Sequence, residues 1–144
     1  MKSYLVTYKT KQFYTVSREF WEDVELGKIL PEYFPEKHYV GPNTRPWVVS
    51  KIPVELPLTS ININACAYQH DYDYSVNTDE MSDAKQEALR LVADKIFYWN
   101  IKANVKNSKV SLVKRTLSYA LAYSYYKIVR TFGKKHFGLP SKIK

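Results

Sequence analysis

At 144 residues the chain is long enough for one domain with a hydrophobic core, and its single cysteine, Cys66, rules out an intramolecular disulfide. The hydrophobic share of 45% and the charged share of 25% are those of a globular protein. The longest uncharged stretch of the C-terminal half, residues 116–126, is far too short to cross a bilayer, and the N-terminus has no continuous apolar segment. We therefore expect neither a transmembrane helix nor a secretory signal peptide.

Charge is divided unevenly along the chain. Positions 1–94 hold all 14 acidic residues and ten Lys or Arg, a net charge of −4, whereas positions 95–144 hold twelve Lys or Arg and no acidic residue, a net charge of +12. A basic half indicates an anionic partner, which can be a phospholipid surface, a nucleic acid or an acidic protein.

Tyrosines are interleaved with the basic residues of the C-terminal half, as is typical of both membrane interfaces and nucleic-acid surfaces. A solvated basic face with buried tyrosines is the alternative reading. The candidate residues for binding an anionic surface are Lys114, Arg115, Lys127, Arg130, Lys134 and Lys135.

The sequence of the N-terminal part, residues 1–57, predicts little regular structure. Residues 1–9 alternate loosely and favour a short strand or an extended arm. Ser17 is a candidate N-cap for a helix that continues to about Leu30, with acidic residues in its first turns. Pro31 to Pro57 contains six of the seven prolines, which predicts a long ordered loop rather than one regular element.

Three helices are predicted after this loop, with short polar breaks between them. The first spans about 59–75 and starts at Thr59 or Ser60. The second spans about 83–102 and starts at Ser82 or Asp83. The third spans about 112–132, with Ser108 or Ser111 as its candidate cap and Gly133 as its end. The short connection between the first two favours an antiparallel pair. We therefore predict a mainly α-helical single domain over 1–144, composed of an N-terminal arm and proline-rich loop (1–57), a helical core (58–133) and a basic tail (134–144).

Candidate catalytic chemistry is concentrated on the first two helices of this core. His70 and Tyr74 lie one turn apart, and Asp94 on the next helix can orient the imidazole so that it takes a proton from water. Tyr74 can hydrogen-bond to Asp94, and Asp71 can offer oxygens to a hard cation such as Ca²⁺. The alternative is a satisfied polar pair between packed helices, with Asp71 in solvent.

These residues resemble the active site of phospholipase A2. The likeness covers residues 39–98 and includes Q-H-D-Y-D-Y at 69–74, Y-V-G-P-N at 39–43 and Ala93-Asp94. It is closest to the cysteine-poor type found in parvovirus capsid proteins. The chain is also similar to uncharacterised tailed-phage proteins, through the same helix, A-D-K-I-F at 93–97 and Y-Y-K-I-V-R-T-F-G at 125–133.

The resemblance implies that His70 activates water, that Asp94 supports His70, and that Ca²⁺ binds to Asp71 and to the carbonyls of Tyr39 and Gly41. Calcium and the Gly41 amide would stabilise the oxyanion during hydrolysis of the sn-2 ester. The leading expectation is a calcium-dependent phospholipid hydrolase that works at an anionic membrane surface, as a phage or viral product of the host cytoplasm or the virion.

A non-catalytic virion or assembly protein is the alternative expectation. Its basic C-terminal half would bind nucleic acid or a neighbouring subunit, so an oligomer is possible. Hydrolysis of another ester or amide by the same residues is a third.

Overall fold

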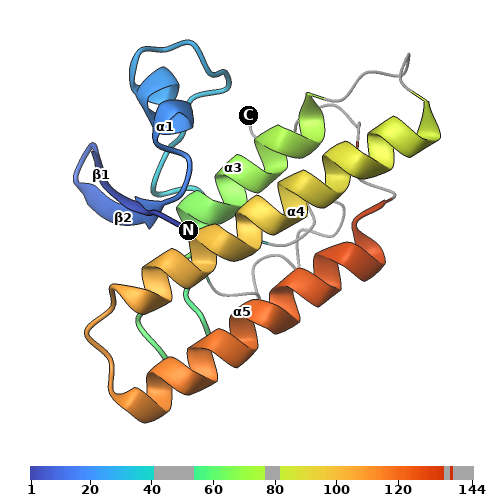
Figure 1. The fold of residues 1–144 in the computed structure, drawn as a ribbon. Coiled ribbons are helices and arrows are strands. Elements are labelled where there is room, and N and C mark those ends of the chain that lie inside the picture. The colour runs from blue at the N-terminus through green and yellow to red at the C-terminus, as the bar shows by residue number, and fades with distance from the viewer. Residues whose placement is uncertain (41–53, 77–81, 135–136, 138–144) are drawn as a thin grey trace.

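The computed structural model describes residues 1–40, 54–76, 82–134 and 137. These residues form four α-helices and one antiparallel pair of strands, which confirms the mainly α-helical class (Figure 1). The elements are β1 (Tyr4–Tyr8), β2 (Lys11–Thr15), α1 (Arg18–Glu25), α3 (Asn64–Ser75), α4 (Asp83–Lys106) and α5 (Leu112–Phe132).

About half of the predicted proline-rich loop, residues 41–53, lies outside the described residues. None of the helices in the described ranges is both long enough and apolar enough to span a membrane.

The three long helices lie side by side, with α4 in contact with both α3 and α5 (Figure 1). Chain direction alternates from α3 to α4 to α5, and the hairpin and α1 lie at the end where α3 begins. Because α4 is the middle helix, its side chains can meet groups from both neighbours. This central position explains why nine of its residues, charged and polar ones among them, are buried.

The N-terminal hairpin was predicted only in part. β1 falls within the expected extended segment 1–9, whereas β2 was not predicted. The strands pair from Tyr4 opposite Thr15 to Tyr8 opposite Lys11, which leaves a two-residue turn at Lys9 and Thr10. Lys9 adopts a φ of 55°, a conformation that Asn or Gly usually supplies in such turns.

An aromatic cluster joins the hairpin, α1 and the segment before residue 40 to the first half of α3. Tyr68 on α3 is fully buried, and its ring lies 4.9 Å from that of Tyr33 and 5.6 Å from that of Trp21. The Tyr68 hydroxyl donates to the Pro31 carbonyl at 2.5 Å, so the one polar atom of this ring is also satisfied. The other buried rings of the cluster are Tyr8, Phe13 and Tyr39.

Two asparagines of α4 attach the hairpin to the helices through its backbone. Asn104 accepts a hydrogen bond from the Tyr14 amide at 2.9 Å and donates one to the Tyr14 carbonyl at 2.8 Å. Asn100, one turn earlier, accepts from the Val16 amide at 2.8 Å and from the Thr15 hydroxyl at 3.1 Å. The two amides therefore replace the third strand that β2 lacks on its outer edge.

The first helix is shorter than predicted. It ends at Glu25 rather than near Leu30, because Gly27 takes a φ of 76° and ends the helix. The Lys28 amide then reaches the Asp23 carbonyl at 2.9 Å, which is the hydrogen bond of a Schellman motif.

Helix α3 begins later than predicted. Thr59 and Ser60 were expected to start it, but it begins at Asn64. Residues 54–63 instead form a turn in which Glu55 and Asn62 pair across an antiparallel bridge, and the Thr59 hydroxyl bonds to the Leu56 carbonyl at 2.8 Å. The expected caps of the next two helices are present, since the side chains of Ser82 and Ser111 each accept from the amide three residues on.

The buried side of α4 also differs from the prediction, which placed Ala84, Ala88, Leu91, Lys95 and Tyr98 along one stripe with Asp94 beside it. The fully buried residues of the helix are instead Arg90, Ala93, Asp94, Phe97, Asn100, Ile101, Ala103, Asn104 and Val105. Apolar periodicity misplaced this face because four of the nine side chains that line it are polar groups satisfied by hydrogen bonds.

We predict that Asn104→Ala lowers the free energy of unfolding by about 2–3 kcal/mol, because it leaves both backbone groups of Tyr14 without their partner. Urea denaturation would measure the change. Asn107→Ala is the matched control: Asn107 is exposed and makes one hydrogen bond, to the Ala103 carbonyl, so a loss of less than about 1 kcal/mol is expected. Equal losses in the two variants would contradict this role of Asn104.

Candidate active site

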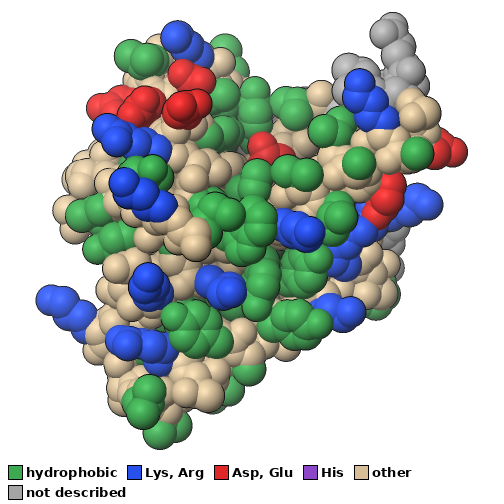
Figure 2. Space-filling model, in the orientation of Figure 1, with side chains coloured by type: hydrophobic (Ala, Val, Ile, Leu, Met, Phe, Trp, Pro, Cys, Tyr) green, Lys and Arg blue, Asp and Glu red, His purple; other side chains and the backbone are tan. Residues whose placement is uncertain are grey.

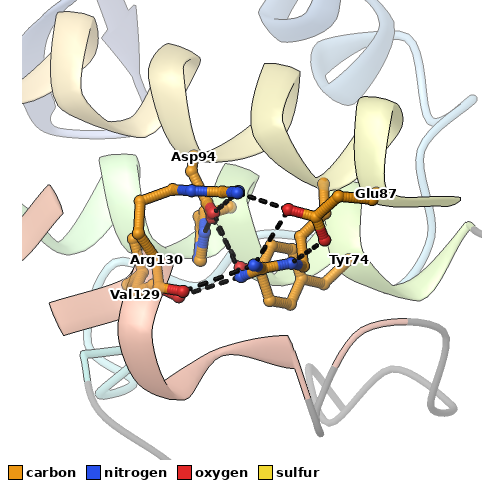
Figure 3. Close-up of polar contacts among 7 residues, drawn as sticks. Tyr74, Glu87, Asp94, Val129 and Arg130 are labelled. Atoms are coloured by element: carbon orange, nitrogen blue, oxygen red, sulfur yellow. Dashed lines mark hydrogen bonds and ion pairs between the residues drawn. The ribbon is translucent and has the colours of Figure 1, made fainter. Parts of the chain in front are cut away.

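The carboxylate of Asp94 is the meeting point of the site. Its side chain is fully buried, and its Oδ1 lies 2.8 Å from Nε2 of His70 and 2.5 Å from the Tyr74 hydroxyl. Figure 3 shows Asp94 on α4 and Tyr74 on α3 converging at this point. The structure therefore brings together the three residues that the sequence predicts as catalytic.

Helical spacing and ring packing hold the imidazole. His70 and Tyr74 are one turn apart on α3, and their ring centroids lie 4.2 Å from each other. Phe97 of α4 covers the His70 ring at 4.6 Å with an interplanar angle of 34°. With a ring on either side and Asp94 at Nε2, the imidazole has one orientation.

Two arginines donate hydrogen bonds to the other oxygen of Asp94, Oδ2. Nη1 of Arg130 donates to Oδ2 at 2.8 Å, and Nη1 of Arg90 lies 3.4 Å from the same atom. Glu87 bonds to both guanidinium groups, as Figure 3 shows. The two carboxylates and the two guanidinium groups balance in charge, which allows Asp94 to remain buried.

The C-terminal end of α5 is attached to this network. Arg90 donates to the carbonyls of Val129 at 3.1 Å and Arg130 at 3.3 Å, where the partial negative charge of the helix end favours a cation. Gly133 follows directly, and a Cβ atom there would lie 2.6 Å from the Tyr74 hydroxyl and 2.5 Å from the Val129 carbonyl. A glycine at 133 is therefore needed for α5 to end against Tyr74.

Electrostatics favour an ionised Asp94. Burial raises the pKa of this carboxyl, but hydrogen bonds from His70, Tyr74 and Arg130 outweigh burial, so the pKa is below its ordinary value. Burial, and then the contact with Asp94, raise the pKa of the Tyr74 phenol. Tyr74 thus remains a hydrogen-bond donor, and Asp94 an acceptor, at neutral pH.

The geometry leaves one nitrogen of His70 for chemistry. A carboxylate only accepts hydrogen bonds, so Nε2 carries the proton that it shares with Asp94, and the lone pair of the neutral ring is on Nδ1. Within the described ranges no side chain or backbone group hydrogen-bonds to Nδ1, and the residue as a whole is 8% exposed. An imidazole held in this way can take a proton from one bound water molecule.

The predicted calcium ligands are described only in part. Asp71 is half-buried and close enough to Tyr39 to help raise the pKa of its phenol, whose main cause is burial. The backbone amide of Tyr39 is held by Asn64 at 2.8 Å, and no described residue hydrogen-bonds to its carbonyl. Gly41 lies outside the described residues. Across all the described residues, the surroundings of Asp71 included, no group of three or more His, Cys, Asp or Glu could hold a metal ion.

The predicted anionic-surface residues differ in environment. Lys114, Lys127 and Lys134 are exposed, and Arg115 is half-buried and donates to the Ser108 carbonyl at 2.9 Å. Arg130 differs from the expectation, because both of its terminal nitrogens are bound to carboxylates of this protein. Lys135 lies outside the described residues.

Sequence reasoning missed Glu87 and Arg90, and it assigned Arg130 to the surface. The spacing of Glu87, Arg90 and Asp94, three and four residues apart on a predicted helix, indicates an ion-pair row and was the available signal. The contact of Arg130 across 36 positions had no such signal.

A second acidic residue of α3 was also missed. Oδ2 of Asp73 is buried and has no hydrogen-bond partner among the described residues. Burial raises the pKa of Asp73 to about 7, against the lowering effect of the nearby Gln69 side chain. Between about pH 4 and 7 the folded state therefore binds more protons at Asp73 than the unfolded state does, so this residue makes stability fall as the pH rises.

We predict that Asp73→Asn stabilises the protein at pH 8 by on the order of 3 kcal/mol and leaves its stability at pH 4 nearly unchanged. Thermal or urea unfolding at the two pH values would measure this. Asp83→Asn, at an exposed position of α4, is the control and should show no such pH-dependent gain. An Asp73→Asn effect of equal size at both pH values would contradict the assignment.

Comparison with known proteins adds no information on function. No protein-family model, curated protein or solved structure matches the chain. The functional proposal therefore depends on the geometry of this chain and on the motif of residues 69–74.

Proposed function

We propose that this protein is a phospholipase A2-like hydrolase in which His70 activates water for attack on a phospholipid ester. The observation that carries the proposal is the contact of Nε2 of His70 with buried Asp94 at 2.8 Å, which leaves Nδ1 as the basic atom. Tyr74 supports it, since its hydroxyl holds the same carboxylate oxygen at 2.5 Å. A dyad held by a third group is the arrangement expected of a general base.

The reaction needs one proton transfer in each direction at Nδ1. Water gives a proton to Nδ1 as its oxygen attacks the ester carbonyl, and the imidazolium that forms is stabilised by Asp94 at Nε2. When the tetrahedral intermediate collapses, Nδ1 returns the proton to the leaving alkoxide. Arg90 and Arg130 keep Asp94 from moving during these steps, because they hold its other oxygen.

Calcium is the proposed cofactor, and Asp71 with the carbonyls of Tyr39 and Gly41 would hold it. Carboxylate and carbonyl oxygens are the ligands that this cation prefers, and the Tyr39 carbonyl, to which no described residue hydrogen-bonds, fits this role. Bound calcium would polarise the ester carbonyl and stabilise its oxyanion. The loop of the proline-rich segment would supply the remaining ligands.

The substrate and setting follow from the motif and the charge. We propose a phospholipid in an anionic membrane, because the C-terminal half carries twelve cationic residues and no acidic residue. The phage and parvovirus likeness of residues 69–74 and 93–97 supports a viral product in the host cytoplasm or the virion.

His70→Ala should abolish phospholipid hydrolysis, with a loss of at least about a hundredfold, because the variant lacks the base. Hydrolysis of anionic vesicles at matched protein concentration, with and without a calcium chelator, is the measurement. His38→Ala is the matched control, since His38 lies on no part of the Asp94 network. Wild-type activity that survives in His70→Ala would contradict the mechanism.

The Asp71→Asn variant tests calcium separately. It should weaken calcium binding, measured by titration calorimetry, while Asp83→Asn binds as the wild type does. If calcium binds equally to both variants, the proposed position of the cation is wrong.

A non-catalytic virion or assembly protein is the second candidate function. It is favoured by the low exposure of His70, 8%, and by the arginines on Asp94, an arrangement that also suits a structural clamp between helices. In that case the wild type has no turnover on vesicles, with or without calcium, and the His70→Ala variant loses only stability.

A further inference from the structure

Three tyrosines form a cluster between α4 and α5, apart from the His70 network. The rings of Tyr98 and Tyr126 are stacked, with centroids 5.2 Å apart and planes at 27°, and Tyr123 lies 6.0 Å from Tyr98 and 6.2 Å from Tyr126. Phe97, the residue before Tyr98, packs on His70 instead. The two neighbours on α4 therefore serve different sides of the helix.

This tyrosine cluster (Tyr98, Tyr123 and Tyr126) is open to solvent and to a ligand. Tyr123 is 50% exposed, and the other two rings are partly exposed. Within the described part of the chain, no hydrogen bond involves any of the three hydroxyl groups. Buried tyrosines of the core differ in this respect, since Tyr68 and Tyr74 both have hydrogen-bond partners.

Lysines surround the cluster. Lys95 and Lys102 lie three residues before and four residues after Tyr98, on the same side of α4, and the Lys102 amine lies 4.8 Å from the centre of the Tyr98 ring. Lys127 follows Tyr126 on α5 and is exposed. Figure 2 shows Lys and Arg side chains spread among hydrophobic ones over α5 and the second half of α4, whereas acidic side chains gather near α1 and the start of α4.

The side chains around Tyr123 distinguish between two kinds of anionic partner. Within two turns of Tyr123, Thr116, Ala120 and Lys127 share its exposed side of α5 and offer no large aliphatic group for insertion into a bilayer. The exposed Leu112 is also on this side but lies three turns away, at the start of the helix. The exposed aliphatic residues Leu117 and Ile128 lie on the opposite flank of the helix. Aromatic faces with lysines between them suit a single strand, because its unpaired bases stack on the rings and its phosphates pair with the lysines.

We propose that the tyrosine cluster and Lys95, Lys102 and Lys127 bind single-stranded nucleic acid. Bases stack on the exposed ring of Tyr123 and beside the Tyr98–Tyr126 pair, and the lysines contact the phosphates. Tyr98 and Tyr126 lie one helical turn from Asp94 and Arg130. No described residue of the cluster hydrogen-bonds to the Asp94 network, so the binding uses none of the groups that hold His70.

Fluorescence anisotropy with a labelled oligo(dT) strand tests the proposal on the full chain. The wild type should bind the single strand more tightly than a duplex of the same length. Tyr123→Ala should weaken binding roughly five- to hundredfold, the range expected for losing one stacked base. Lys102→Gln should also weaken binding, and its difference from the wild type should grow as the salt concentration falls. The slope of log affinity against log salt concentration should become shallower by about 0.7.

The controls keep the test decisive. Tyr4→Ala, at a partly exposed tyrosine of β1, and Lys28→Gln, at an exposed lysine after α1, make the same chemical changes far from the cluster and should each alter affinity less than twofold. Equal effects of Tyr123→Ala and Tyr4→Ala would overturn the proposal. So would binding to the duplex in preference to the single strand, no binding to the strand, or a loss of binding to anionic vesicles in Tyr123→Ala that exceeds its loss of binding to the strand.

Discussion

The buried carboxylate of Asp94 is the constraint on which the arrangement of the three long helices depends. A fully buried carboxylate is tolerated only when both oxygens are paired, and Asp94 takes its partners from all three helices. His70 and Tyr74 of α3 hold one oxygen, and Arg90 of α4 and Arg130 of α5 hold the other. Removing one helix from its place would leave a charge unpaired, so the network fixes the helices relative to the imidazole.

Four polar side chains alternate with apolar ones along the buried face of α4, and the two ends of this polar row have different partners. Its first half, with Asp94, holds the imidazole of α3, and its second half, with Asn100 and Asn104, holds the backbone of β2. Gln69 connects the halves, because it accepts from Asn100 at 3.0 Å and lies one residue before His70. The hairpin thus supports the helix that carries the candidate base.

Local signals in the sequence predicted the features that depend on spacing along one helix. They include the pairing of His70 with Tyr74, the caps at Ser82 and Ser111, and the bounds of α5. Features that depend on contacts between distant segments were not predictable. The β2 strand carries no Asn-Gly turn before it, and its edge is satisfied by asparagines some 90 positions away. Arg130 was predicted to be a surface cation because no residue near it in the sequence is acidic.

Asp94 holds the imidazole of His70 in one tautomer, with the lone pair of the neutral ring on Nδ1. Long-range proton–nitrogen NMR of the ¹⁵N-labelled protein reads the tautomer of the neutral ring directly. We predict that the proton is on Nε2 in the wild type and that this preference is lost in Asp94→Asn. A neutral His70 with its proton on Nδ1 would contradict it, because Nε2 could then give no hydrogen bond to the carboxylate and Nδ1 could take no proton from water.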